Sequence, residues 1–227
     1  METHVDKLIN CLFDTNKCSN AEDVLDPHAN LKRYNLLLIA NNVKMNVLTG
    51  NIIEFGIYKG YTFNLLMDFF GENYNYSGYD SFIGLSEPHH INDNVFYNGC
   101  HKSNLSYAKN KVIRYLQSNA NYEKYNIKLY EGYVSETVPH NLPDEICFAH
   151  VDLDLYEPTL HILRNIIPRM VKGGIIIIDD YKDNNWVGIE NSIKIIESEF
   201  DVKVKSLNLP VSSLQKYPVY QGYIEFV

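Results

Sequence analysis

Long apolar runs, a secretory signal and paired cysteines are all missing from this chain of 227 residues. No stretch approaches the eighteen or more apolar residues of a membrane-spanning helix. The first ten residues, METHVDKLIN, lack an apolar segment after a basic one, so we expect no secretory signal. The four cysteines contain no C-x-x-C pair, which favours neither a zinc knuckle nor a disulfide framework. These absences predict reduced thiols in a cytoplasmic protein without a membrane partner.

Positive charge is also scarce. Twenty basic residues stand against 28 acidic ones, for a formal net charge of −8, and no stretch is strongly basic. Nonspecific affinity for nucleic-acid phosphates needs clustered Lys and Arg. We therefore expect no nucleic-acid partner, and a small molecule or a neutral surface as the substrate.

The rest of the sequence alternates between patterns typical of strands and of helices. Apolar residues at helical spacing predict helices at residues 31–48, 62–70, 106–116, 158–170 and 187–200. Short apolar runs predict strands at residues 51–55, 76–79, 127–130, 146–151, 175–178, 202–204 and 220–226. A short helical turn is expected after Tyr133, and Gly173 and Gly174 are expected to turn the chain into the strand that follows them.

This alternation predicts an α/β fold with one doubly wound, mostly parallel, seven-stranded sheet of the Rossmann-like type. Residues 1–227 are expected to form a single domain, with residues 1–48 as an N-terminal helical extension. The polar segment 81–102 is too long for an ordinary connection in a compact domain. It is interpreted as a lid or substrate loop, with a solvated excursion as an equal alternative.

Carboxylates follow most of the predicted strands. Ligands of such sheets bind beyond the carboxyl ends of the strands, so these side chains are the first candidates for a site. They are Glu54, Asp80, Glu131, Asp152, Asp154, Asp179 and Asp180.

The segment IIEFGIYKGYT predicts a nucleoside pocket. Gly56 permits a sharp turn after the strand, and Gly60 opens a helix whose free N–H groups can hold an anion. Glu54 disfavours a pyrophosphate and suits a ligand with a positive centre and an amino-acid end, such as S-adenosylmethionine. Asp80 ends the next strand, where a carboxylate can accept both ribose hydroxyls. The alternative for Asp80 is an N-cap or Asx-turn role.

The strongest pattern is VDLDLYEPT followed by GGIIIIDDY. Asp179 and Asp180 end one buried strand, while Asp152 and Asp154 leave the strand before it and share a face if that strand persists. Converging carboxylates repel one another unless a cation joins them, and hard oxygen ligands with open positions suit Mg²⁺. A vicinal diol bound to the ion would have a lowered hydroxyl pKa, ready for methylation. The alternative makes these aspartates helix N-caps or helix-entry residues.

Together these motifs resemble the macrocin O-methyltransferase family, which methylates sugar hydroxyls on macrolides and related glycosylated products. The matching stretches, in family order, are IIEFGIYKGYT, YDSFIGLSEP, EGYVSETVP, VDLDLYEPTLHILRNIIPRMVKGGIIIIDDY and residues 188–200. The resemblance implies a class I methyltransferase fold, S-adenosylmethionine as the donor, a sugar-like acceptor and a homo-oligomer. It also implies Mg²⁺ held by Asp152, Asp179 and Asp180.

The candidate cofactor-binding residues are Glu54, Gly56, Tyr58, Gly60, Thr62, Asp80, Ser81, Glu131, Gly132 and Asp152. Glu131 and Gly132 are expected to flank the adenine, with a solvated loop as the alternative. Tyr61 and Thr62 replace the family's usual glycine and serine, so contacts to the methionine end are expected to differ. Ile83 replaces a usual acidic residue, and segment 89–102 matches poorly, so the acceptor is not carried over from the family.

The predicted function is an S-adenosylmethionine-dependent, Mg²⁺-assisted O-methyltransferase acting on a sugar or another small vicinal diol. Asp152 is the expected catalytic base, as metal ligand and proton acceptor together, with Asp154 and His140 as the next candidates. A lone histidine such as His140 or His150 is more often a surface or core residue than a catalyst. Two other functions stay open. A nicotinamide dehydrogenase would want G-x-G-x-x-G, and a non-catalytic S-adenosylmethionine-binding scaffold would not need the late aspartates.

Overall fold

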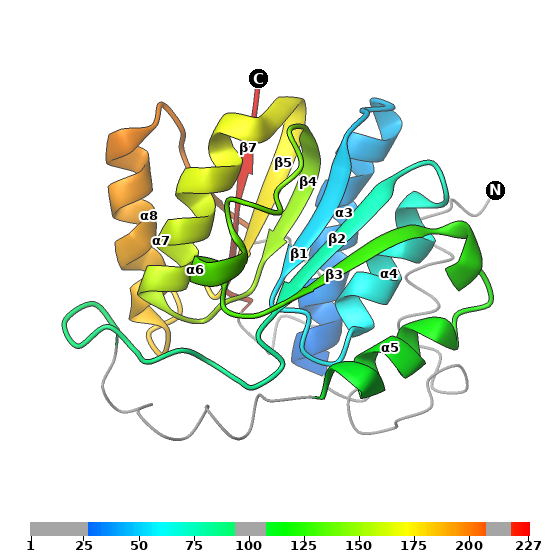
Figure 1. Cartoon of the computed structure of the whole chain (residues 1–227). Helices are drawn as coiled ribbons and strands as arrows, with labels where there is room; N and C mark the ends of the chain where they lie inside the picture. The colour runs from blue at the N-terminus through cyan, green and yellow to red at the C-terminus, as the bar shows by residue number, and fades with distance from the viewer. Residues whose placement is uncertain (1–26, 94–107, 208–218) are drawn as a thin grey trace.

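Seven strands form one sheet in the part of the chain that the computed structural model describes, residues 27–93, 108–207 and 219–227 (Figure 1). Their order across the sheet is β3-β2-β1-β4-β5-β7-β6. Neighbouring strands are parallel from β3 to β5, and β7 is antiparallel to β5 and β6. The prediction of a mostly parallel, seven-stranded sheet is confirmed. The strands are β1 (Asn51–Phe55), β2 (Asn75–Asp80), β3 (Asn126–Glu131), β4 (Ile146–Val151), β5 (Met170–Asp179), β6 (Lys205–Ser206) and β7 (Gln221–Glu225).

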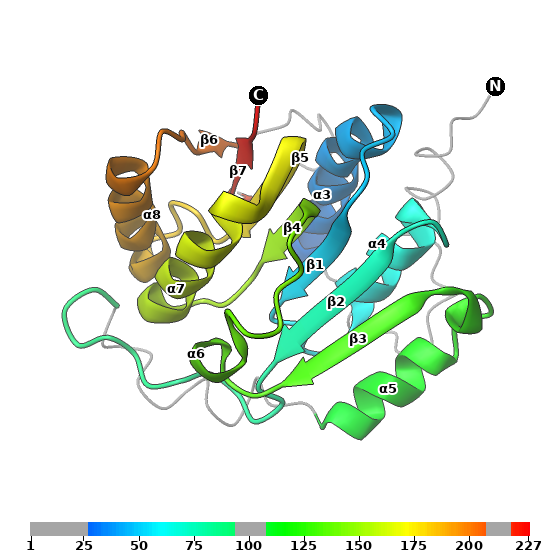
Figure 2. The same ribbon diagram turned by 45° about the horizontal axis from the view of Figure 1, so that its top comes forward.

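Helices cover both faces of the sheet, as the two views show (Figures 1 and 2). Buried side chains of α3, α4 and α5 pack in one hydrophobic core, and those of α6, α7 and α8 pack in a second core on the other face. This arrangement confirms the doubly wound fold. The helices are α3 (Pro27–Met45), α4 (Tyr61–Phe70), α5 (Lys109–Gln117), α6 (Val134–Thr137), α7 (Tyr156–Ile166) and α8 (Val187–Glu199).

The isoleucine run of β5 shows how the sequence places a polar site at the edge of this sheet. Ile175 and Ile177 pack in the core of α3, α4 and α5, whereas Ile176 and Ile178 pack in the core of α6, α7 and α8. Because side chains alternate along a strand, a strand between two helical layers needs apolar residues at every position. Burial of these four residues fixes the next one, Asp179, at the carboxyl end of the strand.

Two predicted boundaries differ from the structure for clear local reasons. The predicted helix 158–170 ends as an α-helix at Ile166 and continues as a 3-10 turn, because Pro168 has no backbone N–H with which to extend the α-helix. β5 then begins at Met170, so Gly173 and Gly174 lie inside the strand. They coincide with a shift in the register between β4 and β5, where Gly173 has a φ of +81°, so an irregularity in the strand takes the place of the predicted turn. The predicted strand 202–204 is wrong in its bounds, because pairing with β7 occurs at β6 instead.

The N-terminal helix is an integral part of the core. It was predicted at residues 31–48 and is observed as α3, whose Leu36, Leu37 and Ala40 are completely buried. None of the helices in the described ranges is long and apolar enough to cross a membrane. Residues 94–102 of the predicted lid lie outside the described residues.

Candidate active site

A cavity of about 950 Å³ opens at the carboxyl edge of the sheet. Its walls come from the segments that follow β1 to β5 and from the first turn of α7. This volume lies near the upper end of the range for small-molecule sites. The predicted site residues that line the cavity are Gly56, Tyr58, Asp80, Ser81, Gly132, Asp152, Asp154 and Asp180.

Gly56 brings the ends of two central strands together. Its φ is +85°, and a β-carbon built on it would lie 1.9 Å from the backbone oxygen of Asp152. The Asp152 N–H donates a hydrogen bond to the Phe55 carbonyl at 2.9 Å. Glycine is therefore needed here for the close approach of Asp152 as well as for the predicted turn.

Asp80 ends β2 and holds the neighbouring loops. Its Oδ2 accepts a hydrogen bond from the Tyr58 N–H at 2.8 Å, and its Oδ1 accepts one from the Phe82 N–H at 2.6 Å. The second contact is the turn role that the sequence offered as an alternative, and it coexists with a place in the cavity wall. Burial raises the pKa of Asp80, and hydrogen bonds from backbone N–H groups oppose this rise.

Four predicted cofactor residues lie outside the main cavity. Glu54 is 1 % exposed, within β1. Gly60 precedes α4 and packs against side chains of α5. Thr62 lines a smaller, adjoining cavity of about 200 Å³. Glu131 is exposed and pairs with Lys109 at 3.0 Å, which is closer to the solvated alternative than to a role beside adenine.

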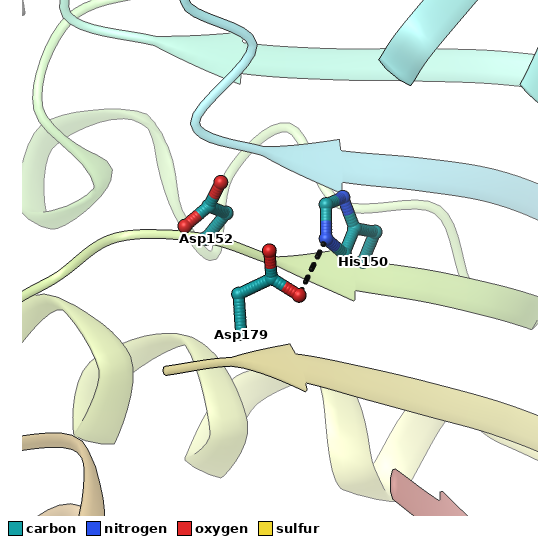
Figure 3. Close-up of side chains that lie close together, drawn as sticks. All are labelled: His150, Asp152 and Asp179. Carbon is teal, nitrogen blue, oxygen red and sulfur yellow. Dashed lines mark ion pairs between the residues drawn. The ribbon is translucent and has the colours of Figure 1, made fainter. Parts of the chain in front are cut away.

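Asp152 is shared by two groups of potential cation ligands. One group is His150, Asp152 and Asp179 (Figure 3), and the other is Asp152, Asp154 and Asp180. Within each group the ligand atoms all lie within 4.8 Å of one another. Asp179 and Asp180, although adjacent in the sequence, thus belong to different groups in the described part of the chain.

Asp154 reaches its group by a different route from the one predicted. β4 ends at Val151, so strand alternation does not set the direction of Asp154, whose backbone instead adopts a left-handed φ of 63°. The N-cap alternative for Asp179 and Asp180 is wrong, because the N-cap residue of α8 is Trp186. The helix-entry alternative for Asp154 agrees with its place directly before Leu155, the N-cap residue of α7.

Lys32 of α3 is a cation at this site that no sequence pattern predicted. Its ammonium nitrogen lies 2.7 Å from Asp180 Oδ1 and 3.4 Å from Asp179 Oδ2. The same side chain lines both the main and the smaller cavity. Four aspartates are clustered here: Asp152, Asp154, Asp179 and Asp180. The single ammonium of Lys32 neutralises only part of their charge, so the cluster keeps a surplus of negative charge.

The pKa values of the aspartates reflect this crowding. Burial, followed by the charge of Asp179, raises the pKa of Asp152 to about 7. Burial and the neighbouring carboxylates raise the pKa of Asp154 well above its ordinary value. Burial acts in the same direction on Asp179, but the charges of Lys32 and His150 prevail and lower its pKa. At neutral pH the cluster therefore holds protons that a bound cation would replace.

We expect the cation-free chain to lose stability from Asp152 as the pH rises. The pKa of Asp152 is about 7 in the folded chain and about 4 in the unfolded chain. Between these values the folded state binds more protons, so the free energy of unfolding falls with increasing pH. Asp152→Asn should match the parent near pH 4 and exceed its stability by about 1–4 kcal/mol at pH 8. Urea unfolding of both chains with EDTA measures this, and a pH-independent difference would contradict it.

Asp93 fixes the described part of the predicted lid against α7 and α8. It is 7 % exposed, and its carboxylate accepts hydrogen bonds from the N–H groups of His89 at 2.7 Å and Tyr156 at 2.9 Å. A β-carbon on Gly188 of α8 would lie 1.8 Å from Asp93 Oδ1. The preceding residues, 84–87, line the cavity. This part of the segment therefore forms a cavity wall that is fixed next to the aspartates.

Asp93→Ala should lower the free energy of unfolding by about 2–4 kcal/mol, because two partly buried N–H groups lose a charged acceptor. Asp93→Asn keeps one acceptor oxygen and should cost roughly half as much. Gly188→Ala should also destabilise, yet less in the Asp93→Ala background, where the added methyl group has room. Chemical denaturation measures the three changes. Full additivity of Asp93→Ala and Gly188→Ala would show that the two residues do not meet.

Two further residues at the site escaped prediction. Gln221 of β7 donates a hydrogen bond from Nε2 to Asp179 Oδ1 at 2.7 Å, and its distance along the chain left no local signal. His150 was interpreted as an ordinary surface or core histidine. Its position two residues before Asp152 was the available signal, because such residues share one face of a strand.

His140 is wrong as a candidate base. It is exposed and lines a different cavity together with Asn51, Asn75 and Asn126, the first residues of β1, β2 and β3. That cavity lies at the amino ends of the strands, whereas Asp152 follows the carboxyl end of β4.

Comparison with known proteins gives a family match over most of the chain. The sequence model of a family described as Macrocin-O-methyltransferase (TylF) matches residues 29–218. A curated relative, the 8-demethyl-8-(2,3-dimethoxy-alpha-L-rhamnosyl)-tetracenomycin-C 4'-O-methyltransferase of Streptomyces olivaceus, is 36% identical over 70 residues. This match covers 29% of the chain and 27% of the relative, so it spans about a quarter of that protein's length.

Solved structures share the fold at low sequence identity. The O-methyltransferase NovP aligns with a TM-score of 0.79 and 18% identity, covering 99% of this chain and 98% of that one. An O-methyltransferase from Bacillus cereus in complex with SAH aligns with a TM-score of 0.53 and 16% identity, covering 97% and 88%. These likenesses confirm the predicted class I methyltransferase fold.

Proposed function

The chain belongs to the macrocin O-methyltransferase family, and we propose that it transfers the methyl group of S-adenosylmethionine to a hydroxyl of a sugar or another small vicinal diol, assisted by a divalent cation. One observation carries this proposal: Asp152, Asp154 and Asp180 meet in a cavity at the carboxyl edge of a class I methyltransferase sheet. The name of the Streptomyces relative, which specifies a rhamnosyl-bearing substrate, supports a sugar as the acceptor.

The donor is proposed to lie on the side of the cavity formed by the ends of β1, β2 and β3. The Asp80 carboxylate accepts hydrogen bonds from backbone N–H groups that include those of Tyr58 and Phe82, and its remaining lone pairs would accept ribose hydroxyls. Gly56, Tyr58 and Ser81 form the adjoining wall, and Gly132 is proposed to lie beside the adenine. S-adenosylmethionine would supply a methyl group activated by a sulfonium charge. The SAH complex of the Bacillus cereus protein supports this donor.

Mg²⁺ is the proposed cation for the main cavity, with Asp152, Asp154 and Asp180 as its protein ligands. Asp179, which the family resemblance includes in this set, lines the smaller cavity instead. Three carboxylates within 4.8 Å of one another support this choice, because Lys32 neutralises only part of their charge and oxygen ligands suit Mg²⁺. When bound, the ion would orient the acceptor hydroxyl and lower its pKa.

Asp152 is proposed to take the proton of the acceptor hydroxyl, and Asp154 is the second candidate for this role. The carboxylate of Asp152 follows β4 and lines the cavity, where it could accept this proton. The acceptor oxygen bonds to the methyl carbon while the carbon–sulfur bond breaks and its electron pair stays on sulfur, which yields S-adenosylhomocysteine. Holding both reactants in one cavity supplies much of the rate enhancement.

Methyl transfer from labelled S-adenosylmethionine to a panel of glycosides tests this function. We expect label to appear in a glycoside that carries a vicinal diol and to be absent from the matching aglycone. Calorimetry on the same protein should measure the binding of S-adenosylmethionine. Binding of S-adenosylmethionine without transfer to any glycoside would contradict the proposal and favour the non-catalytic scaffold.

A homo-oligomer and a cytoplasmic location are also proposed, the first from the family resemblance and the second from the absence of paired cysteines. The free, buried thiol of Cys147 supports reduced cysteines. Light scattering of the purified chain tests the oligomer, and a monomer at micromolar concentration would contradict it.

A further inference from the structure

His150 has the surroundings of a metal ligand. It lies on β4, two residues before Asp152, and is 3 % exposed. Its Nδ1 lies 2.9 Å from Glu54 Oε1. Glu54 is itself 1 % exposed. A histidine that bonds a carboxylate through one nitrogen has a fixed ring orientation and presents its other nitrogen to a metal, as in carboxylate–histidine–metal arrangements.

The second nitrogen of His150 points at two aspartates and lacks a hydrogen-bond partner. Nε2 lies 3.3 Å from Asp179 Oδ1 (Figure 3), but no well-aligned hydrogen bond to it exists among the described residues. In Figure 3 the side chains of Asp152 and Asp179 both lie on the side of the His150 ring that carries Nε2. An unsatisfied polar atom in such a buried place is costly unless a ligand completes it.

The charges around His150 also call for a cation. The carboxylates of Glu54, Asp152 and Asp179 all lie beside it. The Lys32 ammonium is shared between Asp180, at 2.7 Å, and Asp179, at 3.4 Å. The smaller cavity gives this place room of about 200 Å³, and Lys32 and Arg33 line it together with His150, Asp152 and Asp179.

We propose that His150, Asp152 and Asp179 form a second cation site, which takes a divalent transition ion such as Mn²⁺ in preference to Mg²⁺, with Glu54 as the residue that orients His150. An imidazole nitrogen in the ligand set favours first-row transition ions, whereas Mg²⁺ prefers oxygen ligands throughout. The site adjoins the proposed active site through Asp152 and would fix the direction of that carboxylate. It does not depend on the proposed methyl transfer.

Pulsed electron paramagnetic resonance of bound Mn²⁺ tests this site on the full chain. One equivalent of Mn²⁺ is added in the presence of excess Mg²⁺, which fills sites made only of oxygen ligands. We expect nitrogen modulation from a histidine ligand in the parent chain, its loss in His150→Gln, and its retention in His161→Gln. His161 is the matched control because it lines the main cavity and its Nε2 is within hydrogen-bond distance of the Val138 carbonyl.

Glu54→Gln provides a second variant in case His150→Gln does not fold. It keeps an acceptor for Nδ1 but removes the charge, so the nitrogen frequencies should shift and Mn²⁺ affinity should fall by about 10–100-fold. Absence of nitrogen modulation in the parent, its persistence in His150→Gln, or identical frequencies in Glu54→Gln would each overturn the site.

Methyl transfer measured on the same samples separates the two proposals. Transfer with Mg²⁺ but no nitrogen modulation would remove the second cation site and leave the proposed function intact. Nitrogen modulation without transfer to any glycoside would uphold the site and remove the proposed function.

Discussion

Asp152→Asn should lower the rate of methyl transfer about a thousandfold while leaving the chain folded. The carboxylate of Asp152 belongs to both groups of potential cation ligands, and it is also the proposed proton acceptor. An amide cannot take the proton and is a weaker cation ligand, so one substitution removes two contributions. Because the buried charge of Asp152 is unfavourable without a cation, its loss should not unfold the protein. The maximal rate with labelled donor and saturating acceptor measures the effect.

Asp201→Asn is the matched control, because Asp201 is exposed and follows α8, far along the chain from the cluster. Its rate should equal that of the parent. Asp154→Asn belongs in the same series, since a larger loss there than in Asp152→Asn would move the role of the base to Asp154. A parental rate in Asp152→Asn would contradict the proposed site as a whole.

Gly56→Ala should damage both stability and activity. Its φ of +85° is unfavourable for alanine, and the new β-carbon would lie 1.9 Å from the Asp152 carbonyl oxygen, so β1 and the segment after β4 must move apart. We expect the free energy of unfolding to fall by about 3–5 kcal/mol, the sum of backbone strain and forced displacement. The same displacement shifts Asp152 in the cavity, so the rate of methyl transfer should fall at least about a hundredfold.

Gly71→Ala separates strain from displacement. Gly71 has nearly the same φ, +87°, but a β-carbon on it meets no atom within 4 Å. In Gly71→Ala the free energy of unfolding should fall by about 1–3 kcal/mol, from backbone strain alone, and the rate of methyl transfer should equal that of the parent. Thermal or urea unfolding with a rate measurement on each variant makes the comparison. Equal rates in the two variants would show that the approach of Gly56 to Asp152 does not matter for the site.

The sheet could be predicted because burial between two helical layers leaves a strong pattern in the sequence. Runs such as Ile175 to Ile178 can form only a strand that is covered on both faces, and this argument also places the aspartates that follow. Boundaries were less accurate where a local residue overrode the periodicity, as Pro168 does at the end of α7. Likewise, Gly173 lies at an irregularity inside β5 and not before its start, because β4 pairs with Met170 as well as with Ile175.

From the sequence, site residues could be predicted only where the end of a strand determines their position. The carboxylates that follow β4 and β5 converge as expected, but the predicted set of Asp152, Asp179 and Asp180 is not the one observed. Asp154 and Asp180, both with a left-handed backbone, lie together with Asp152, whereas Asp179 belongs to the group of His150. No periodicity encodes such single-residue conformations. Lys32 is brought to the site by the packing of α3 on the sheet, which depends on contacts far apart in the sequence.

The direct measurement of the central claim is the methyl-transfer rate of the chain before and after removal of divalent ions. The claim is that carboxylates centred on Asp152 hold a cation next to the reacting methyl group. We predict that EDTA abolishes transfer, that added Mg²⁺ or Mn²⁺ restores it to the parental chain, and that neither ion restores it to Asp152→Asn. Transfer that continues unchanged in EDTA would contradict the claim.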